Sequence, residues 1–199
     1  MTASLRQAQA DLARYQARLR RCIQAAIANY QAEIGRFAYR HTKRSQASLV
    51  HDYMVDAIRA EFQDEPGITF STRRNLFTVD FFHRYLIKLK KHDRYLRTSN
   101  IPTQLVLDWL DQKQLELPDM PDATTKLHLG YQPGLTLATS KVWLTCPDGS
   151  TLDWKWELAS EEPMELPMPD VGPQPLPMRV LRPRPVAPAS EAASDDRDR

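Results

Sequence analysis

The stretch Arg84-Tyr-Leu-Ile-Lys-Leu-Lys-Lys91 alternates apolar with basic side chains. Successive side chains of an extended chain point to opposite sides, so the apolar ones share one side: Tyr85, Ile87 and Leu89. The basic ones share the other side: Arg84, Lys88 and Lys90. A period of two residues predicts a β-strand, here with one dry face and one basic face.

Segments on both sides of this strand predict a mainly antiparallel sheet. The other expected strands cover residues 68–71, 76–82, 126–131, 135–145 and 151–158. Asp148-Gly149 is a hairpin signal between the last two. A short helix is expected after Pro102, and Trp109 lies on its apolar side.

The chain before this sheet is predicted to be helical. Apolar residues recur at three- and four-residue spacing from Leu5 to Phe37, which predicts one long amphipathic helix. A second helix is expected from Ser45, as N-cap, to Phe62, before the stop signal Pro66-Gly67. The fold class is therefore α+β: a long N-terminal helix and a second helix, then a mainly antiparallel sheet with one inserted helix.

The composition changes near Ser160. Residues 160–199 hold nine of the 15 prolines and no aromatic residue. Such a segment buries too little apolar surface to offset its ordering entropy, so we expect a disordered tail, partly of polyproline-II form. Pro175-Leu-Pro-Met-Arg179 also resembles a short linear docking segment. The expected division is a long helix at 1–40, an α+β domain at 41–159 and the tail at 160–199.

The overall composition excludes several classes of protein. The 199 residues are 42% apolar and 26% charged, which is typical of a soluble globular protein. No apolar run approaches the roughly 18 residues of a membrane helix, and the arginine-rich N-terminus has no apolar signal-peptide core. Cys22 and Cys146 are too few for a disulfide scaffold and suit a reducing compartment. We therefore expect a cytoplasmic protein.

A formal net charge of +2 hides strongly basic and acidic segments. Residues 1–44 contain nine Lys and Arg and only two acidic residues, and residues 66–113 contain nine against four. Residues 45–65 contain one arginine and five acidic residues. Basic segments can supply a phosphate-binding footprint, although a solvated helix face has the same composition.

The sequence carries no motif for metal, nucleophilic or nucleotide chemistry. Its five histidines are scattered, and it has no Cys-x-x-Cys pair. No cysteine or serine lies in a nucleophile elbow, and the six glycines form no phosphate-binding loop. The sequence thus predicts no catalytic residue, no metal ligand and no cofactor.

One set of acids and lysines supports an alternative hypothesis. Asp52 falls on the second expected helix, Asp80 at the end of a strand and Lys88 on the next strand. Metal-dependent nucleases use carboxylates to hold Mg²⁺ and a lysine to stabilise the attacking water or the developing charge. The order of these residues is similar to that of restriction-endonuclease-like folds, although Leu86 stands where those folds place an acid. The alternative is therefore a magnesium-dependent nuclease.

Four short motifs between His41 and Leu158 carry a family resemblance: Leu86-Ile-Lys-Leu-Lys-Lys-His-Asp93, Ser99-Asn-Ile-Pro-Thr-Gln104, Leu117-Pro-x-x-Pro121 and Leu129-Gly-Tyr131. They look like an uncharacterised bacterial family encoded near helix-turn-helix regulators. The resemblance implies a toxin–antitoxin or phage-defence setting and assigns no catalytic residue.

The leading hypothesis is a bacterial interaction protein that binds a regulatory protein or nucleic acid. The expected binding residues are Arg84, Lys88 and Lys90 on the basic face of the strand, together with Lys91 at its end. No membrane partner is expected. The helix at residues 5–37 could also join two copies into a homo-oligomer.

Overall fold

The structure is a computed structural model that describes residues 2–73, 76–99, 103–112 and 124–159. The expected C-terminal tail at residues 160–199 lies outside the described residues. Residues 1–161 form one compact unit. The helical segment at 1–40 belongs to that unit.

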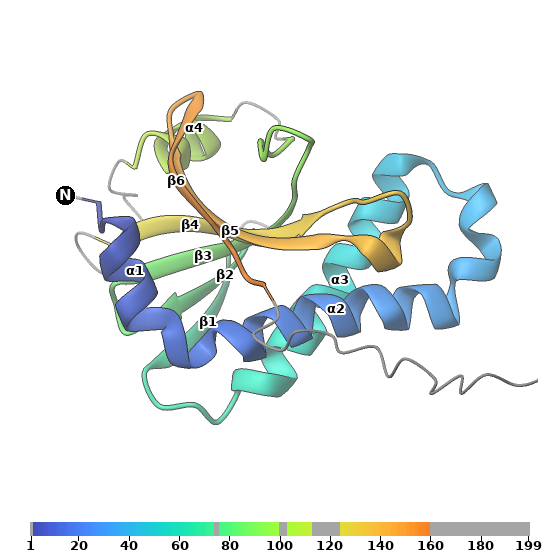
Figure 1. The fold of residues 1–199 in the computed structure, drawn as a ribbon, viewed down its shortest axis with the longest axis horizontal. Helices are drawn as coiled ribbons and strands as arrows, with labels where there is room; N and C mark the ends of the chain where they lie inside the picture. Colours follow the sequence, from blue (N-terminus) through green and yellow to red (C-terminus); the bar gives the residue numbers. More distant parts are fainter. Residues whose placement is uncertain (1, 74–75, 100–102, 113–123, 160–199) are drawn as a thin grey trace, which may run out of the picture. The chain divides into compact units, whose positions relative to one another are not determined.

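Six strands form one sheet in the order of the chain (Figure 1). They are β1 (Ile68–Arg73), β2 (Leu76–Phe81), β3 (Tyr85–Lys91), β4 (Thr125–Gln132), β5 (Lys141–Asp148) and β6 (Thr151–Glu157). Every neighbouring pair is antiparallel except β3 and β4, which run parallel. The connection between these two strands contains α4 (Gln104–Leu110). The prediction of a mainly antiparallel sheet with one inserted helix is confirmed.

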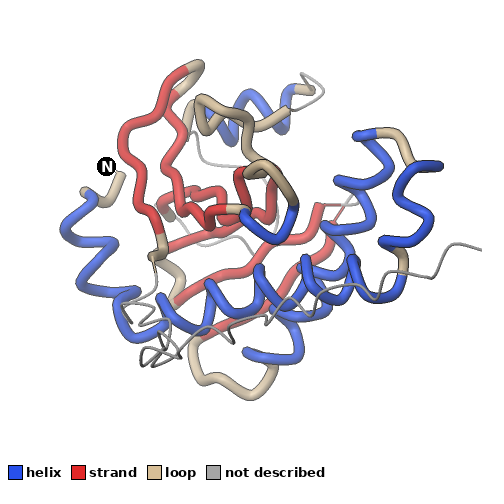
Figure 2. The backbone as a smooth tube through the Cα atoms, turned by 45° about the vertical axis from the view of Figure 1, so that its right-hand side comes forward, coloured by secondary structure: helices blue, strands red, loops and turns tan. Residues whose placement is uncertain are grey.

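The N-terminal helices form a layer beside the sheet (Figure 2). They are α1 (Leu5–Leu12), α2 (Gln16–Glu33) and α3 (Lys43–Phe62), with 3₁₀ turns at Ala13–Tyr15 and Gly35–Arg40. The single helix expected over residues 5–37 is therefore broken in two places. The N-cap of α3 is Thr42 rather than Ser45, and the Thr42 hydroxyl accepts a hydrogen bond from the Ser45 backbone N–H. No helix of the described residues is long and apolar enough to cross a membrane.

Tertiary contacts of Tyr15 account for the first break. Its ring packs edge-on against Phe62 and Phe81, with centroid distances of 5.9 and 5.5 Å. Its hydroxyl donates a hydrogen bond to Glu65. Such aromatic pairs each contribute about 0.5–1.5 kcal/mol beyond their buried area. The 3₁₀ turn that ends at Tyr15 therefore joins α1 and α2 where this aromatic cluster forms.

One face of the sheet forms the apolar core with these helices. Alternate residues of the strands point into it, among them Val79, Ile87, Leu129 and Leu144. The helices contribute the other side of the same core, including Leu19, Ile23, Met54 and Ile58. Because one face of every strand is committed to this core, the opposite face receives the residues at the intervening positions.

The predictions for the last two strands differ in accuracy. The hairpin between β5 and β6 forms as expected, with Asp148 paired to Thr151 and Gly149 at φ +55°. The strand expected over residues 135–145 begins only at Lys141. Residues Leu137–Thr139 form a 3₁₀ turn instead, because Thr136 and Thr139 make reciprocal capping hydrogen bonds.

Gly130 allows the backbones of β3 and β4 to approach closely. A Cβ at this position would collide with the backbone carbonyl of Lys90. Both groups lie within the central parallel pair, where Lys90 is aligned with Gly130. Only a residue without a side chain fits there.

We expect Gly130→Ala to lower the free energy of unfolding by about 1–3 kcal/mol, because the backbone of a central strand must shift. Urea denaturation would measure the change. Gly35→Ala is the control, since its Cβ would meet Gln31 Cβ at an ordinary 3.7 Å. Equal effects of the two substitutions would contradict the steric role of Gly130.

Candidate functional site

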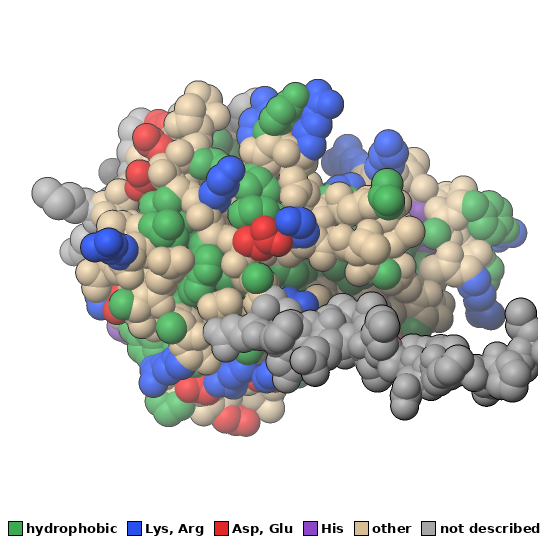
Figure 3. Space-filling model, in the orientation of Figure 1, with side chains coloured by type: hydrophobic (Ala, Val, Ile, Leu, Met, Phe, Trp, Pro, Cys, Tyr) green, Lys and Arg blue, Asp and Glu red, His purple; other side chains and the backbone are tan. Residues whose placement is uncertain are grey.

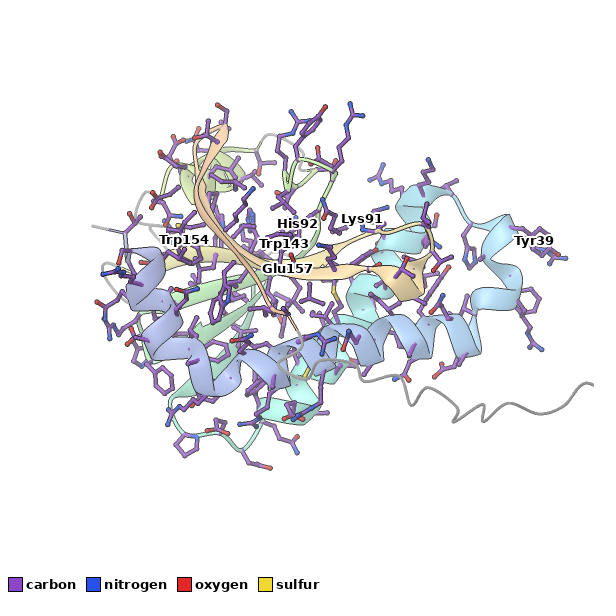
Figure 4. The ribbon with its side chains drawn as sticks, in the orientation of Figure 1. Tyr39, Lys91, His92, Trp143, Trp154 and Glu157 are labelled. Carbon is purple, nitrogen blue, oxygen red and sulfur yellow. The ribbon has the colours of Figure 1, made fainter. Side chains whose placement is uncertain are left out.

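The face of the sheet opposite the helical layer is rich in polar side chains, and we call it the polar face. Strand register brings its residues into three rows: Asp80, Leu86 and Lys126; Lys88, His128, Thr145 and Lys155; and Lys90, Gly130, Trp143 and Glu157. His92, two residues beyond Lys90, extends the same face (Figure 4). The predicted basic side of β3 is therefore part of a larger surface built from five strands.

Arg84 does not share this face with Lys88 and Lys90, contrary to the expectation from the sequence. It precedes β3, and its guanidinium lies 3.0 Å from the Asp11 carboxylate of α1. Tyr85 donates a hydrogen bond to the same carboxylate at 2.7 Å. The preceding Phe82 and His83 both have positive φ, so the chain reverses before the strand alternation begins.

Lys88 lies on the polar face but is only 3% exposed, because α4 covers it. Its ammonium nitrogen lies 3.6 Å from the ring centroid of Trp109, within the range of a cation–π contact. The Trp109 ring is also parallel to that of His128, at a centroid distance of 6.1 Å. Lys88 is therefore not available to a large partner without movement of α4.

Burial strongly affects the protonation of Lys88 and of the basic residues near it. Desolvation, helped by the charges of Lys90 and Lys126, lowers the pKa of Lys88 to about 7. Desolvation likewise lowers the pKa of Lys126 to about 8, although Asp108 acts in the opposite direction. The pKa of His128 falls well below its usual value for the same reason, so its ring is neutral.

Lys90 and Lys91 are partly exposed at the end of β3. Burial lowers the pKa of both, and the charge of Lys43 lowers that of Lys91 further. Lys91 thus lies close to the start of α3. Lys90 is aligned with Gly130 on the polar face, whereas Lys91 is aligned with the core residue Tyr131 and points to the helical side of the sheet.

The residues of the nuclease hypothesis are only partly brought together. Asp80 and Lys88 lie on the same face of adjacent strands, and the Asp80 carboxylate is 2.6 Å from Nδ1 of His83. Leu86 is aligned with Asp80. Asp52 is on α3, a helix that packs on the other face of the sheet, and its side chain is 75% exposed. Among the described residues, no three His, Cys, Asp or Glu side chains gather as metal ligands would.

A second set of basic residues is exposed beside aromatic rings, and we call it the basic–aromatic surface. It comprises Arg36, Phe37, Tyr39, Arg40, Lys43 and Arg44 around the start of α3, then Lys91, and then Arg94, Tyr95 and Arg97 after β3. Basic and apolar side chains appear along the upper and right-hand edges in Figure 3, over these two segments. Tyr39 is 77% exposed and points outward (Figure 4), and Tyr95 is 57% exposed.

Arginine side chains stack on the exposed rings. The guanidinium carbon of Arg94 lies 4.6 Å from the centroid of Tyr95, and that of Arg40 lies 5.3 Å from the centroid of Tyr39. Arg40 also donates a hydrogen bond to the Tyr39 hydroxyl. Asp93 holds the second segment by accepting from the backbone N–H groups of Tyr95 and Arg97. These contacts preorganise the aromatic rings.

The predicted binding face relied on the alternation of β3 and did not include the exposed basic residues around it. The run Arg36-Phe-Ala-Tyr-Arg-His-Thr-Lys-Arg44 contains four Lys and Arg residues, one histidine and no acid, so the sequence itself indicates a basic surface here. Lys126, His92 and Trp109 had no comparable signal, because they meet Lys88 only through the parallel register and the position of α4.

We expect the protein to become more stable as the pH rises from 6.5 to 8.5 in a phosphate-free buffer. An unfolded lysine titrates near pH 10.4, whereas Lys88 titrates at about 7 in the fold. The unfolded state thus binds more protons above pH 7, and the free energy of unfolding rises by up to about 1.4 kcal/mol per pH unit for one such lysine.

Lys88→Met should remove most of this slope below pH 8, as measured by urea denaturation. The matched control is Lys155→Met, which changes an exposed lysine in the same row. A Lys88→Met variant that keeps the wild-type slope would show that Lys88 stays protonated throughout.

Comparisons with protein-family models, with curated proteins and with solved structures find no match to this chain.

Proposed function

We propose that this chain is a bacterial interaction protein that binds nucleic acid through the basic–aromatic surface. The observation that carries the proposal is the exposure of stacked Arg–Tyr pairs beside basic residues that form no ion pair within the described part of the chain. The family resemblance adds a toxin–antitoxin or phage-defence setting to the proposal. The proposal includes a cytoplasmic location, because nucleic acid is accessible there and the buried free cysteines would stay reduced.

Charge supports an anionic partner. Within the described part of the chain, Arg36, Arg40, Lys43, Lys91 and Arg94 make no ion pair. Lysine and arginine residues that are not neutralised by the protein can replace the counterions of phosphate groups. Electrostatic attraction of this kind acts without regard to base sequence.

The aromatic rings favour nucleic acid over an acidic protein surface. Bases of single strands stack on exposed tyrosine rings and on guanidinium planes, at about 1–3 kcal/mol per base. Tyr39 and Tyr95 each have an arginine stacked on them and remain mostly exposed. An acidic protein surface would also bind the basic groups, but stacking on the tyrosine rings would contribute less to its affinity.

We expect the chain to bind short single-stranded oligonucleotides in a fluorescence-anisotropy titration, with an affinity that falls steeply as salt rises. Charge reversal of Arg40, Lys43 and Arg94 to Glu should weaken binding at least about tenfold and reduce the salt slope by roughly one per lost phosphate contact. Tyr39→Ala with Tyr95→Ala should weaken binding about fivefold or more.

Lys155→Glu is the matched control, because it reverses an exposed basic residue outside this surface. Binding that is equally weak in the control would assign the effect to net charge alone. Capture of a host protein that survives nuclease treatment and depends on Lys43 and Arg94 would favour the regulatory-protein alternative.

Magnesium-dependent nuclease activity is the second candidate, and the shared face of Asp80 and Lys88 favours it. A hydrated Mg²⁺ ion needs converging carboxylates and substrate oxygens as ligands. Leu86, which is aligned with Asp80 on the neighbouring strand, supplies no such ligand. We therefore expect no magnesium-dependent cleavage of the oligonucleotides that bind. Cleavage that disappears in Asp80→Asn and persists in Lys155→Met would instead establish the nuclease.

A further inference from the structure

The first strand of the sheet has an open outer edge. β1 lies at one end of the strand order and pairs only with β2 in the described part of the chain (Figure 1). β6 lies at the other end of the sheet. The edge of a strand presents backbone N–H and C=O groups that can pair with a further strand. The two edges of this sheet differ in how they are protected from such pairing.

β6 has the features that protect an edge strand, whereas β1 lacks them. Three charged residues alternate along β6: Asp153, Lys155 and Glu157. The indole N–H of Trp154 donates to the carbonyl oxygen of Ala3, so the N-terminal segment lies beside β6. Charged side chains, proline or a covering segment protect natural edge strands. β1 contains no charged residue and no proline over residues 68–72, so its edge is suited to pairing.

The hydrogen bonds next to β1 identify the peptide groups that point outward. The Phe82 N–H donates to the Gly67 carbonyl oxygen at 2.7 Å, immediately before β1. In an antiparallel pair, residues bonded to the partner strand alternate with residues whose peptide groups point away from it. Ile68, Phe70 and Thr72 therefore point their N–H and C=O groups away from β2.

Two of these residues have both peptide groups free. The Ile68 N–H donates to the carbonyl oxygen of Glu65. The outward groups of Phe70 and Thr72 have no such partner among the residues that the structure describes. The free edge is therefore centred on Ser71, which lies between them.

The two ends of this edge carry opposite charges. Arg59 of α3 donates to the Thr72 hydroxyl at 3.2 Å, so its guanidinium lies near the end of β1. Asp64 lies in the turn between α3 and the start of β1. Both side chains are exposed, and neither forms an ion pair within the described residues. An antiparallel partner with the same sequence brings Asp64 of each copy toward Arg59 of the other, whereas a parallel partner would bring like charges together.

We propose that β1 pairs with β1 of a second copy of this chain, antiparallel about a two-fold axis at Ser71. Phe70 of each copy lies opposite Thr72 of the other, and this register engages both free peptide groups of the two residues. The interface is isologous, because both copies supply the same residues to it. The two six-stranded sheets join into one continuous sheet.

Side-chain packing at the edge suits this partner. The Phe70 ring is only partly buried and stacks on Phe77 at a centroid distance of 6.0 Å. The partner copy places a Thr72 side chain against this ring, and pairs of aromatic and β-branched residues across strands are favourable. The apolar side of α1 and α2 is buried in the core of the same chain and takes no part in the contact. Because the shared edge is short, the dimer dissociates on dilution.

Sedimentation velocity of the nuclease-treated full chain at a series of concentrations measures the association. We expect a monomer–dimer equilibrium for wild type. Thr72→Pro should weaken dimerisation at least about tenfold, because proline removes an N–H that points away from β2 and leaves the β1–β2 hydrogen bonds in place. The matched control is Thr72→Val, which loses the hydroxyl but keeps the N–H and should dimerise nearly as wild type does.

Charged substitutions at Ser71 test the position of the axis. Ser71→Lys and Ser71→Glu should each weaken dimerisation at least about tenfold, because like charges then meet across the axis. An equimolar mixture of the two variants should form a heterodimer. Ser71 alternates with the core-facing side chains of β1, so both variants should unfold cooperatively in urea as wild type does.

Three results would overturn the proposal. The first is a wild-type chain that stays monomeric at every concentration. The second is a dimer that is equally stable in wild type and in folded Thr72→Pro. The third is a mixture of folded Ser71→Lys and Ser71→Glu that associates no better than either variant alone. This third result holds even if Thr72→Pro does not fold. The dimer does not depend on the proposed nucleic-acid function, so Tyr39→Ala with Tyr95→Ala should leave its dissociation constant unchanged.

Discussion

The parallel pairing of β3 with β4 is the constraint on which the rest of the structure depends. A parallel pair cannot be joined by a tight turn and needs a long crossover connection, and here that connection contains α4. The helices α1 to α3 already cover one face of the sheet. Since α4 contacts Lys88 and His128 through Trp109, it covers the other face, and it is this cover that buries the basic residues of β3 and β4.

Periodicity predicted the elements of this fold well because it reflects local exposure. The strand at residues 84–91 and the helix ending at Phe62 both show one apolar side, and both form nearly as expected. Periodicity does not predict which strands become neighbours in the sheet. Nothing within β3 indicates that its neighbour on one side is parallel, and the alternation of Lys88 and Lys90 shows which side they face but not what covers that side. Lys88 was therefore expected to be exposed, although α4 buries it.

Local backbone geometry explains two other departures from the sequence prediction. Phe82 and His83 adopt positive φ, so the alternation that includes Arg84 in the sequence is interrupted before β3 begins. The apolar stripe from Leu5 to Phe37 looks continuous at helical spacing, yet Tyr15 is fixed by Phe62, Phe81 and Glu65, which are distant in the sequence. In both cases tertiary contacts or turn geometry overrode a periodic pattern, as is common where propensity is a weak prior.

Ion pairing explains why the surface near the start of α3 stays basic although the neighbouring sequence is acidic. Arg18 of α2 binds Glu61 and Glu65 at 2.6 Å each, and both acids come from the acidic segment at residues 45–65. Those acids lie at the end of α3 that is far from Lys43, because α3 is 20 residues long and rises about 1.5 Å per residue. At physiological ionic strength, charges that far apart are screened from one another. Glu61 and Glu65 therefore neutralise Arg18 locally and leave Arg36, Arg40 and Lys43 with their charge exposed to solvent, which a near-neutral total charge conceals.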